Sequence, residues 1–527
     1  MSHRTGLALG VAALLLAGGP SSGQTVLRSV MHADLKSIDP VWTTATITRY
    51  HGHMVYETLF GIDGQNLPQP QMVGDHTLSA DRLTYTFVLR DGLKFHDAQP
   101  VTAEDVAASI KRWAARDAAG QMMMRFTKDI VATDARTVTL TLSEPFGLVI
   151  DALAQPTATP AFIVPKRVAT TDPGTQIDDP VGSGPFRMAK EQWVPGSRTV
   201  YVKNADYVPR SEAASGTAGG RIAKIDRVEW VVLPDAQTTT AALGRGEIDY
   251  YEGISADFIP ILKGSTGVRV ETLSPLGSAG IMRLNHLHPP FDNPAIRRAM
   301  LNLVNQKEIL SAAIGDPARY TVCGAILICG SPMGSEAGAE AMIAELPEAE
   351  RLARAKKALA DAGYKGEPVI LLHSADHNIF HPVATVLESW LRRGGVNVQL
   401  ATSDWGTVIT RRNRKEAGAS GWHIFLTSGG GFSAANPAFH IPMSAACDKA
   451  WFGWPCDETM EKLRVDWVKA PSLEARKQVA VEIQKRSMEI VLYIPYGQWQ
   501  TPIAFRSSLS GILAVPETQV FWNIAKM

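Results

Sequence analysis

The stretch Leu83–Arg112 reads LTYTFVLRDGLKFHDAQPVTAEDVAASIKR, and it decides the first fold prediction. Apolar and polar residues alternate through its first half, which is the period of a half-buried β-strand. The apolar positions on either side of the Asp91-Gly92 dipeptide are Tyr85, Phe87, Leu89, Leu93 and Phe95. Because Asp-Gly is a preferred turn dipeptide, the pattern predicts a β-hairpin.

A helix is predicted to follow this hairpin. Pro100 stops strand pairing, and Thr102 offers an N-cap with Asp105 three residues later, in the capping-box position. The apolar residues that then share one helical face are Val106, Ile110 and Trp113. The stretch is therefore predicted to be a hairpin that leads into an amphipathic helix.

As a string, this stretch closely resembles the signature of family 5 of the extracellular solute-binding proteins, the dipeptide, oligopeptide and nickel-binding group that feeds ABC importers. Four other segments resemble further parts of that family: VYETLFG at Val55–Gly61, PVGSGPFR at Pro180–Arg187, PFDNPAIRRA at Pro290–Ala299 and AKKALADAGY at Ala355–Tyr364. Five such strings in the family's order are a strong resemblance, and they span most of the chain.

The resemblance implies an α/β fold with two lobes, the type II, cluster C-like arrangement of periplasmic binding proteins. It implies lobe I at 24–273 with an extra subdomain at about 64–180, lobe II at 274–496, and a return to lobe I at 497–527. The crossovers are expected near Leu273–Ala279 and Tyr496–Gln500, with a ligand cleft at the hinge.

The hydrophobic periodicity agrees with two α/β lobes. Strand-like runs in the first half are Thr137–Leu142, Arg198–Val202, Arg227–Leu233 and Val268–Leu273. Pro294 is predicted to open one helix whose apolar face carries Ile296, Met300, Leu303, Val304 and Leu310. A β-α-β unit is predicted from a strand, a helix and a strand at Val369–Leu372, Val383–Leu391 and Val396–Leu400.

The N-terminus has the pattern of a secretory signal peptide. Arg4 supplies the positive charge, Leu7–Ala17 is an apolar run too short to span a bilayer, and Ser21-Ser22-Gly23 offers small residues for cleavage before Gln24. The alternative is an uncleaved anchor. We expect residues 1–23 to be removed and the mature protein to be exported to the periplasm.

The four cysteines fall into two close pairs, Cys323/Cys329 and Cys447/Cys456. In an oxidising compartment, an even number of cysteines in short loops favours disulfides. A zinc site with four thiolates usually has C-x-x-C spacings, which are narrower than the spacings in these two pairs. We predict two local disulfides, each of which pins a loop.

Composition and motifs exclude several classes of function. Lys plus Arg and Asp plus Glu both number 52, so the formal net charge is zero. The charge balance therefore gives no reason to expect nucleic acid as a partner. The one G-x-S-x-G string, Gly19–Gly23, lies in the predicted signal peptide, and no metalloprotease, Walker or dinucleotide-binding motif occurs in a fitting context. We therefore predict a protein that is not an enzyme and needs no cofactor.

The resemblance implies a periplasmic substrate-binding component of an ABC importer. It would act as a monomer, capture a small peptide-like or other organic solute by hinge closure, and deliver it to the permease and its ATPase. Two alternatives stay open: a metal- or metallophore-binding member of the family, and a periplasmic chaperone or chemosensor on the same scaffold.

Ligand contacts are expected from segments that match the family's cleft. The loop after a lobe II strand, His373–His377, includes Ser374 and Asp376, and the next strand is followed by Trp405. Trp405 fits either the cleft or the core. The other residues expected to contact ligand are Trp42, Thr43, Phe432, Ser433 and Asn436.

Two of these positions bear on the charge of the ligand. Ser433 stands where peptide-binding members carry the aspartate that grips the ligand's amine, and Ser374 where some carry the arginine for its carboxylate. Neither serine can pair with a charge. The sequence therefore predicts a cavity without counter-charges, a less charged ligand, weak binding of free dipeptides, and loss of binding in Ser433→Asp.

Several histidines raise a metal hypothesis. His373, His377 and His381 are four residues apart, and His51 and His53 flank Gly52. The first three are predicted to lie in a loop and a helix entry, where helical spacing does not gather them, so we predict no metal site.

Overall fold

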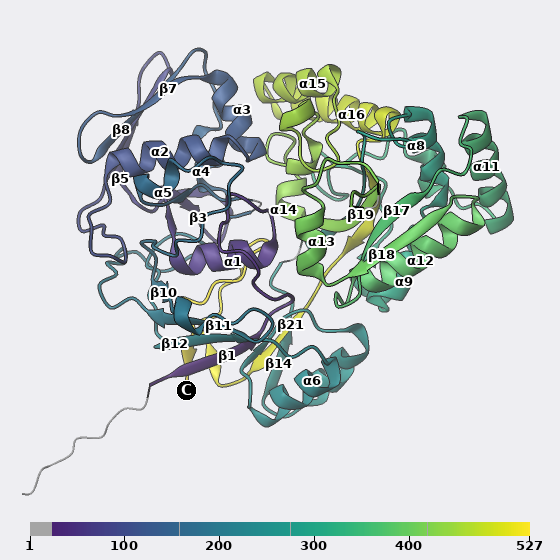
Figure 1. Ribbon diagram of the computed structural model, residues 1–527. Coiled ribbons are helices and arrows are strands. Elements are labelled where there is room, and N and C mark those ends of the chain that lie inside the picture. The colour runs from purple at the N-terminus through teal and green to yellow at the C-terminus, as the bar shows by residue number, and fades with distance from the viewer. Residues whose placement is uncertain (1–23, 158, 275, 419) are drawn as a thin grey trace, which may run out of the picture.

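The structure is a computed structural model that describes residues 24–157, 159–274, 276–418 and 420–527. The predicted signal peptide, residues 1–23, lies outside the described residues. Two lobes lie side by side, and the second, built from the middle of the chain, is the green part of Figure 1. The predicted two-lobe α/β fold is confirmed.

Lobe I is built on a seven-stranded sheet in the order β10-β11-β12-β1-β13-β21-β14. Its strands are β1 (Val26–Val30), β10 (Phe186–Met188), β11 (Arg198–Lys203), β12 (Arg227–Val231), β13 (Tyr250–Tyr251), β14 (Val268–Glu271) and β21 (Ile503–Arg506). β1 pairs in parallel with β12 and β13, whereas β21 pairs antiparallel with β13 and β14. The C-terminal segment thus completes a sheet that the N-terminal strand begins.

Helices and one small sheet complete this part of lobe I. They are α1 (Thr46–Val55), α6 (Ala236–Arg245), α7 (Ile259–Gly264), and the pair β22 (Leu509–Ser510) and β23 (Ala525–Lys526). α1 lies at the boundary between the lobes, opposite the short lobe II helix α14 (Gly431–Ala434) (Figure 1).

A separate unit of lobe I, at the upper left of Figure 1, is a four-stranded antiparallel sheet in the order β5-β6-β8-β7 with helices packed on it. The strands are β5 (Val73–Leu78), β6 (Thr84–Leu89), β7 (Thr127–Ala132) and β8 (Thr137–Leu142), and the helices are α2 (Ala103–Ala114), α3 (Ala118–Phe126), α4 (Val149–Ala154) and α5 (Lys166–Ala169). Two short pairs, β2 (Glu57–Thr58) with β9 (Phe162–Ile163) and β3 (Phe60–Ile62) with β4 (Pro68–Pro70), join this unit to the rest of the lobe.

The predicted hairpin is wrong, although its first strand exists. β6 pairs with β5 and β8, and not with the segment after Gly92. Leu93 and Phe95 are buried in an irregular loop, where only Lys94 and Pro100 form an isolated bridge. Alternating burial along a loop gives the same sequence pattern as a strand, so the pattern could not separate the two.

The helix predicted after this loop is confirmed as α2. Thr102 caps it, since the Thr102 hydroxyl accepts from the Asp105 amide and the Asp105 carboxylate accepts from the Thr102 amide. Val106, Ile110 and Trp113 are fully buried on the predicted face. The capping box satisfies amides that the first helical turn leaves free.

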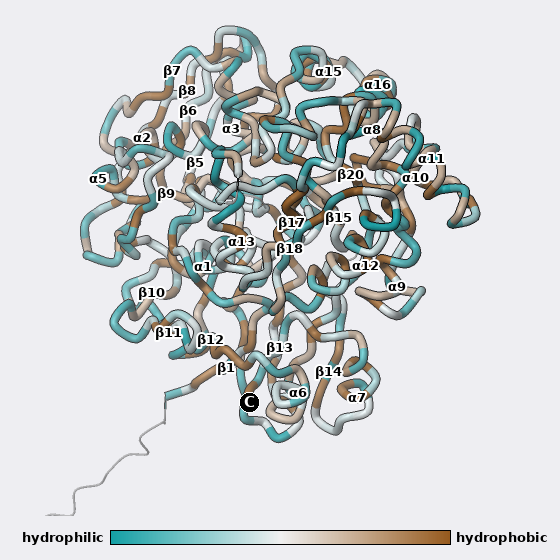
Figure 2. The backbone as a smooth tube through the Cα atoms, turned by 45° about the vertical axis from the view of Figure 1, so that its right-hand side comes forward, coloured by the Kyte–Doolittle hydropathy of each residue, from teal (hydrophilic) through white to brown (hydrophobic). Residues whose placement is uncertain are grey.

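Lobe II is built on a six-stranded sheet in the order β16-β20-β15-β19-β17-β18. Its strands are β15 (Ser278–Leu284), β16 (Tyr320–Thr321), β17 (Val369–Ser374), β18 (Val398–Ser403), β19 (Ile424–Gly430) and β20 (Ile494–Trp499). Besides α14, its helices are α8 (Pro294–Met300), α9 (Gln306–Ile314), α10 (Glu340–Ile343), α11 (Glu348–Asp361), α12 (Phe380–Arg393), α13 (Trp405–Arg411), α15 (Glu458–Lys469) and α16 (Leu473–Ile490). Hydrophobic residues gather along its central strands, such as β17 (Figure 2).

The predicted β-α-β unit is confirmed, because β17, α12 and β18 follow each other and the two strands pair in parallel. The single helix predicted from Pro294 is wrong. α8 ends at Met300, one 3-10 turn follows, and α9 begins after Asn305, whose side chain accepts from the Glu308 amide at 3.3 Å. A new N-cap therefore divides one apolar stripe between two helices.

The chain crosses between the lobes twice. It leaves the lobe I sheet after Glu271 in β14 and enters the lobe II sheet at Ser278 in β15, within the expected segment. It leaves the lobe II sheet after Trp499 in β20 and re-enters the lobe I sheet at Ile503 in β21. The second crossing thus lies a few residues beyond the expected boundary at 496, because β20 runs on through the predicted hinge.

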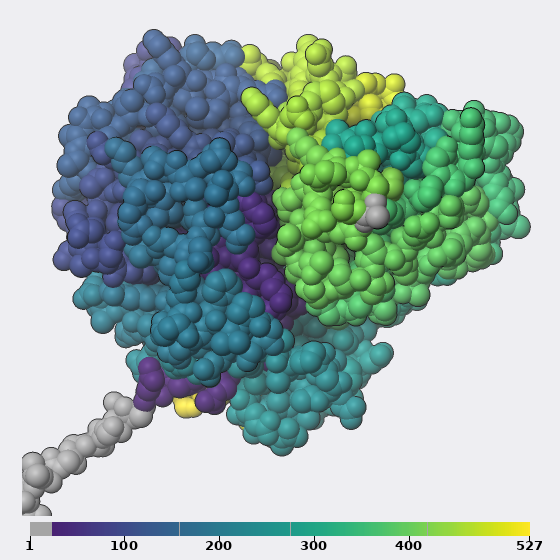
Figure 3. Space-filling view, in the orientation of Figure 1, coloured from purple at the N-terminus to yellow at the C-terminus, as the bar shows by residue number. Residues whose placement is uncertain are grey.

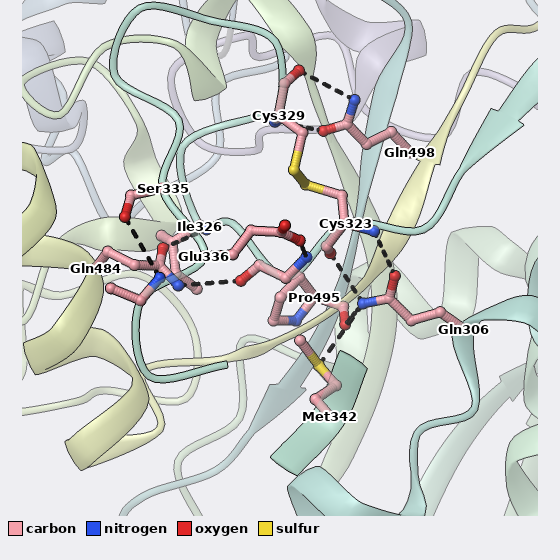
Figure 4. The surroundings of a disulfide bond; sticks show 12 residues. Gln306, Cys323, Ile326, Cys329, Ser335, Glu336, Met342, Gln484, Pro495 and Gln498 are labelled. Carbon is pink, nitrogen blue, oxygen red and sulfur yellow. Dashed lines mark hydrogen bonds between the residues drawn. A yellow bond between two sulfur atoms is a disulfide. The ribbon is translucent and has the colours of Figure 1, made fainter. Parts of the chain in front are cut away.

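Both predicted disulfides are present, Cys323–Cys329 and Cys447–Cys456. Figure 4 shows the first of them in lobe II. Gln306 bonds both backbone groups of Cys323, at 2.7 and 2.9 Å, and Gln498 bonds both of Cys329, at 2.6 and 3.3 Å. This loop is fixed to α9 and β20 by side-chain amides as well as by the covalent bond.

Candidate ligand-binding site

A cavity of 230 Å³ lies between the two lobes. The lobe I wall consists of residues that follow β1 and β13, the first turn of α1 with the residues before it, and the segment 515–519. The lobe II wall consists of the N-terminal ends of α12 and α13, the end of β19, and the loop after α14. In Figure 3 the blue and green surfaces meet along the seam that separates these lobes, with purple N-terminal residues inside it. Ligand sites are commonly enclosed in this way between domains.

The lobe I wall holds an acidic group that is already satisfied. Glu252 is buried, accepts from the Tyr50 hydroxyl at 2.8 Å, and lies 2.7 Å from His32 Nδ1. Burial alone would raise the pKa of Glu252, but the His32 charge and these hydrogen bonds outweigh it and lower the pKa. Glu252 is therefore an ionised carboxylate with its partners in place.

A second carboxyl group, Glu517, reaches from lobe I to Ser433 of lobe II. The Ser433 amide donates to Glu517 Oε1 at 2.7 Å, and Ser433 Oγ lies 3.2 Å from Oε2. The Glu517 backbone has a left-handed φ of 58°, and a Cβ on Gly430 would collide with its carboxyl group. Gly430 is therefore needed so that Glu517 can lie against the end of β19.

The hydrogen bonds at Ser433 fit a protonated Glu517. Ser433 has one hydroxyl proton and lies 3.1 Å from the Gly430 carbonyl, so it can donate there and accept from a protonated Oε2. Burial raises the pKa of Glu517 above its ordinary value, and the nearby Arg49 charge opposes the rise. Arg49, on α1, also donates from Nη2 to the Glu517 carbonyl.

The lobe II wall holds a buried cation without an acidic partner. Arg412, at the end of α13, is 2 % exposed and donates from Nη2 to Thr44 Oγ1 across the cleft at 3.0 Å. Among the described residues no carboxylate forms an ion pair with it, and its Nε has no hydrogen bond. The guanidinium lies over the Phe452 ring at 4.6 Å, and burial lowers its pKa to about 9. Arg412 therefore stays charged at neutral pH.

Two histidines add neutral groups of known tautomer. The Tyr493 hydroxyl donates to the Ile326 carbonyl, so it accepts from His440 Nε2 at 2.8 Å and leaves His440 Nδ1 as a bare, unpartnered acceptor. His377 Nδ1 accepts from the Ile379 and Phe380 amides, so its proton is on Nε2. Burial, with nearby cationic groups, lowers the pKa of each histidine to about 3.

Trp405 lines the cavity and is only partly buried. Its ring packs against His377 at 5.2 Å and Phe380 at 5.0 Å, and the Asp376 carboxylate accepts from its backbone amide at 2.8 Å. The side chain therefore forms an aromatic surface at the cleft, supported by the loop that follows β17.

The residues singled out in the sequence divide between the cavity and other places. Trp405, Ser433 and His377 line the cavity. Trp42 lines a neighbouring chamber, and Asp376 lines a smaller pocket that Trp405 also borders. The others, which lie off the wall of this cavity, are Thr43, His373, Ser374, Phe432 and Asn436.

The prediction of a cavity without counter-charges is wrong. The two family anchor positions, Ser433 and Ser374, carry no charge. The charges on this wall come instead from Arg49, Arg412 and Glu252, and Glu517 adds a titratable carboxyl group. No motif marks Arg49 or Arg412, and Glu517 lies in the C-terminal return, far from Ser433 in sequence. Only the Gly429–Gly431 run hinted that a group must approach β19 closely.

The histidines that raised the metal hypothesis do not surround a common point. His373 Nε2 lies 2.8 Å from His381 Nδ1, whereas His377 bonds the entry of α12. His51 and His53 are buried in α1, next to Tyr201 and the Pro156 carbonyl. Among the described residues, the group of three closest potential metal ligands is Cys323, Cys329 and Glu336, and both of its sulfurs are held in a disulfide.

Comparison with known proteins places the chain in a family. Residues 68–448 match the bacterial extracellular solute-binding proteins, family 5 Middle. The chain belongs to family 5. It is 36% identical over 531 residues to the probable peptide ABC transporter periplasmic-binding protein y4tO of Sinorhizobium fredii, which covers 99% of this chain and 97% of that protein. It is 27% identical over 443 residues to the glutathione-binding protein GsiB of Escherichia coli, covering 82% and 80% of the two.

Solved structures of other binding proteins share the fold. The A. tumefaciens protein AgaA, in complex with agropinic acid, has a TM-score of 0.78 at 21% identity and covers 95% of this chain and 99% of its own. A Pseudoalteromonas dipeptide-binding protein in complex with Met-Leu has a TM-score of 0.76 at 20% identity, covering 95% and 100%. Within the described residues, no helix combines the length and apolarity needed to cross a bilayer.

Proposed function

We propose that this protein captures a peptide-like or amino-acid-derived organic acid in the periplasm and delivers it to the permease of an ABC importer. Membership of family 5 supports the importer role. The relative y4tO is named as a probable peptide transporter component, and GsiB as a glutathione-binding protein. Both names favour a peptide-like solute.

The observation that carries the ligand class is Arg412. A buried guanidinium without an acidic partner is costly, and a ligand carboxylate in the cavity would supply the missing charge. His440 Nδ1 then offers an acceptor for an N–H or ammonium group of the same ligand. In this proposal the ligand carboxylate lies at Arg412 and its amine at His440.

A series of dipeptides tests this assignment. Isothermal titration calorimetry would compare Ala-Phe with its C-terminal amide and with its N-acetyl form. The amide should bind about tenfold or more weakly, because it leaves Arg412 unpaired, and acetylation should have the smaller effect. Equal affinity for the acid and the amide would contradict a carboxylate at Arg412.

Export and passive binding are parts of the same proposal. The N-terminal pattern supports cleavage before Gln24, and N-terminal sequencing of protein recovered from the periplasm checks it. We also propose that the solute is bound without being changed. Mass spectrometry of the solute released from the purified protein should then find it at the same mass after prolonged incubation.

A further inference from the structure

A second chamber, of 270 Å³, lies beside the first cavity and also between the lobes. The two share Thr44, Ile441 and Trp451 on their walls. The chamber is bounded in lobe I by the turn between α2 and α3, and in lobe II by the loop that the Cys447–Cys456 disulfide closes. Of the residues expected to contact ligand, Trp42 lines it.

Aromatic rings form much of this chamber's wall. Trp42 comes from lobe I, and Trp451 and Trp454 from the disulfide loop of lobe II. Cys447 and Trp454 both have left-handed backbones, with φ of 56° and 45°, which few non-glycine residues adopt. The disulfide loop thus holds an unfavourable backbone that places Trp454 on the wall, as functional sites often do.

The chamber's charged residues are mostly basic. Arg116, Lys415 and Lys449 line it against one acid, Asp448, which Lys415 pairs at 3.1 Å. Arg116 is partly buried and donates from Nη2 to the Trp42 carbonyl at 3.0 Å, which fixes it beside that ring. Within the described residues, no carboxylate forms an ion pair with Arg116 or Lys449. The wall therefore combines flat rings with unpaired cations.

We propose that this second chamber binds a ring that carries an anionic group, as the distal part of the solute held in the first cavity. Indole and other aromatic faces stack on aryl rings and on the apolar faces of sugar rings, and the cations favour a carboxylate attached to such a ring. The inference rests on the proposed function, since it extends the same solute. It adds a second anionic, ring-bearing portion to the carboxylate at Arg412.

Thr44 separates the two chambers. Its hydroxyl oxygen accepts from Arg412 Nη2 at 3.0 Å and from Trp451 Nε1 at 3.4 Å, both across the cleft. The partition thus includes two hydrogen bonds that join lobe I to lobe II. A solute that spans both chambers would pass this side chain, so closure and ligand length are coupled at Thr44.

Two fragment probes test the chamber on the full-length mature protein. Ligand-observed NMR would give dissociation constants for indole-3-acetate and D-glucuronate, an aryl and a sugar form of the proposed chemistry. Arg116→Met should weaken the probe that binds by about tenfold, the effect of one charge-assisted hydrogen bond. Lys94→Met, an exposed change on the same subdomain, should leave binding unchanged. Arg412→Met should weaken Ala-Phe but not the fragment.

Further outcomes separate this inference from the proposed function. Lys449→Glu alters only an exposed side chain at the chamber, so it tests the charge without affecting folding, and it should weaken the same fragment. A fragment that responds to Arg412→Met but to neither Arg116→Met nor Lys449→Glu binds in the first cavity, which overturns the second chamber and leaves the proposed function intact. Failure of both fragments to bind the wild type also overturns it, whereas Ala-Phe binding tests the proposed function alone.

Discussion

The two walls of the interlobe cavity differ in how their charges are satisfied. On the lobe I wall, Glu252 has His32 and Tyr50 as partners, and Glu517 has Ser433 across the cleft. On the lobe II wall, Arg412 has one hydroxyl and three aromatic rings around it, and no acid among the described residues. The lobe I acids therefore have partners without ligand, whereas the Nε atoms of Arg49 in lobe I and Arg412 in lobe II have none, and Arg412 is the more deeply buried of the two.

This difference indicates which group the ligand completes. A satisfied carboxylate gains little from a new partner, whereas a buried, unpaired guanidinium has already lost its water and gains a strong hydrogen bond. Binding energy should therefore concentrate at Arg412, and the lobe I acids should mainly govern closure and its pH dependence. The four predictions that follow test whether Arg412 governs binding and the lobe I acids govern closure.

The largest effect is expected for Arg412→Met. Truncating one partner of a buried charge pair costs about 2–5 kcal/mol of binding, roughly 30-fold to several thousandfold in Kd. The ligand-free protein should melt at the same temperature or higher, because the change removes an unpaired buried charge. Calorimetric titration and thermal melts measure the two effects on one sample.

Arg414→Met is the matched control for this prediction, since Arg414 lies two residues away and is exposed. It should change neither affinity nor melting temperature. If Arg412→Met destabilised the ligand-free protein by as much as it weakened binding, Arg412 would be a structural residue. That result would contradict the proposed difference between the two walls.

Trp405→Ala should have the next largest effect. The ring is partly exposed on the cavity wall, so its loss should weaken binding about tenfold while lowering stability only modestly. Trp390→Ala in α12 is the comparison, because Trp390 is 1% exposed and its truncation should cost about 3–5 kcal/mol of stability. Equal destabilisation by the two changes would place Trp405 in the core instead.

Sequence reasoning reached the fold through features that are local in the chain. The Thr102–Asp105 capping box, the β17-α12-β18 unit and both disulfides depend on residues a few positions apart, and their patterns are specific. The hairpin after β6 failed because buried loop residues such as Phe95 alternate like a strand. The alternation of apolar residues indicates which side chains are buried, but it does not indicate which strands pair, because pairing depends on contacts with residues far along the chain.

The charges of the cavity could not be predicted for the same reason. Ser433 lies on the cavity wall, but its partner Glu517 is 84 residues away, in the segment that returns to lobe I. Nothing in the local sequence relates Glu517 to β19 except Gly430, which leaves room for it. An anchor missing at one position can be replaced from another lobe, and a single sequence does not record that exchange.

Ser433→Asp tests this replacement. The new carboxylate would lie beside Glu517, and two carboxyl groups at hydrogen-bond distance cannot both ionise, so the closed form should be disfavoured. Adding Glu517→Gln should restore closure, because one acid and one amide can share the hydrogen bonds. Small-angle scattering and calorimetry on the single and double variants measure this coupling. Equal losses in both variants would show that the introduced carboxylate does not meet Glu517.

The smallest effect is a pH dependence of closure in the ligand-free protein. Burial raises the pKa of Glu517 in the closed form, and opening returns the carboxyl group to water and to its ordinary value of 4.5. The closed form therefore binds the proton more tightly, and its advantage is complete below pH 4.5 and lost as pH rises through the raised pKa. Arg49 opposes the shift, which keeps the effect small.

His377 and His440, with pKa values of about 3, stay neutral throughout this range. Scattering between about pH 4.5 and 8 should show gradual opening in the wild type and none in Glu517→Gln, whereas the same opening in both would assign the proton to another group.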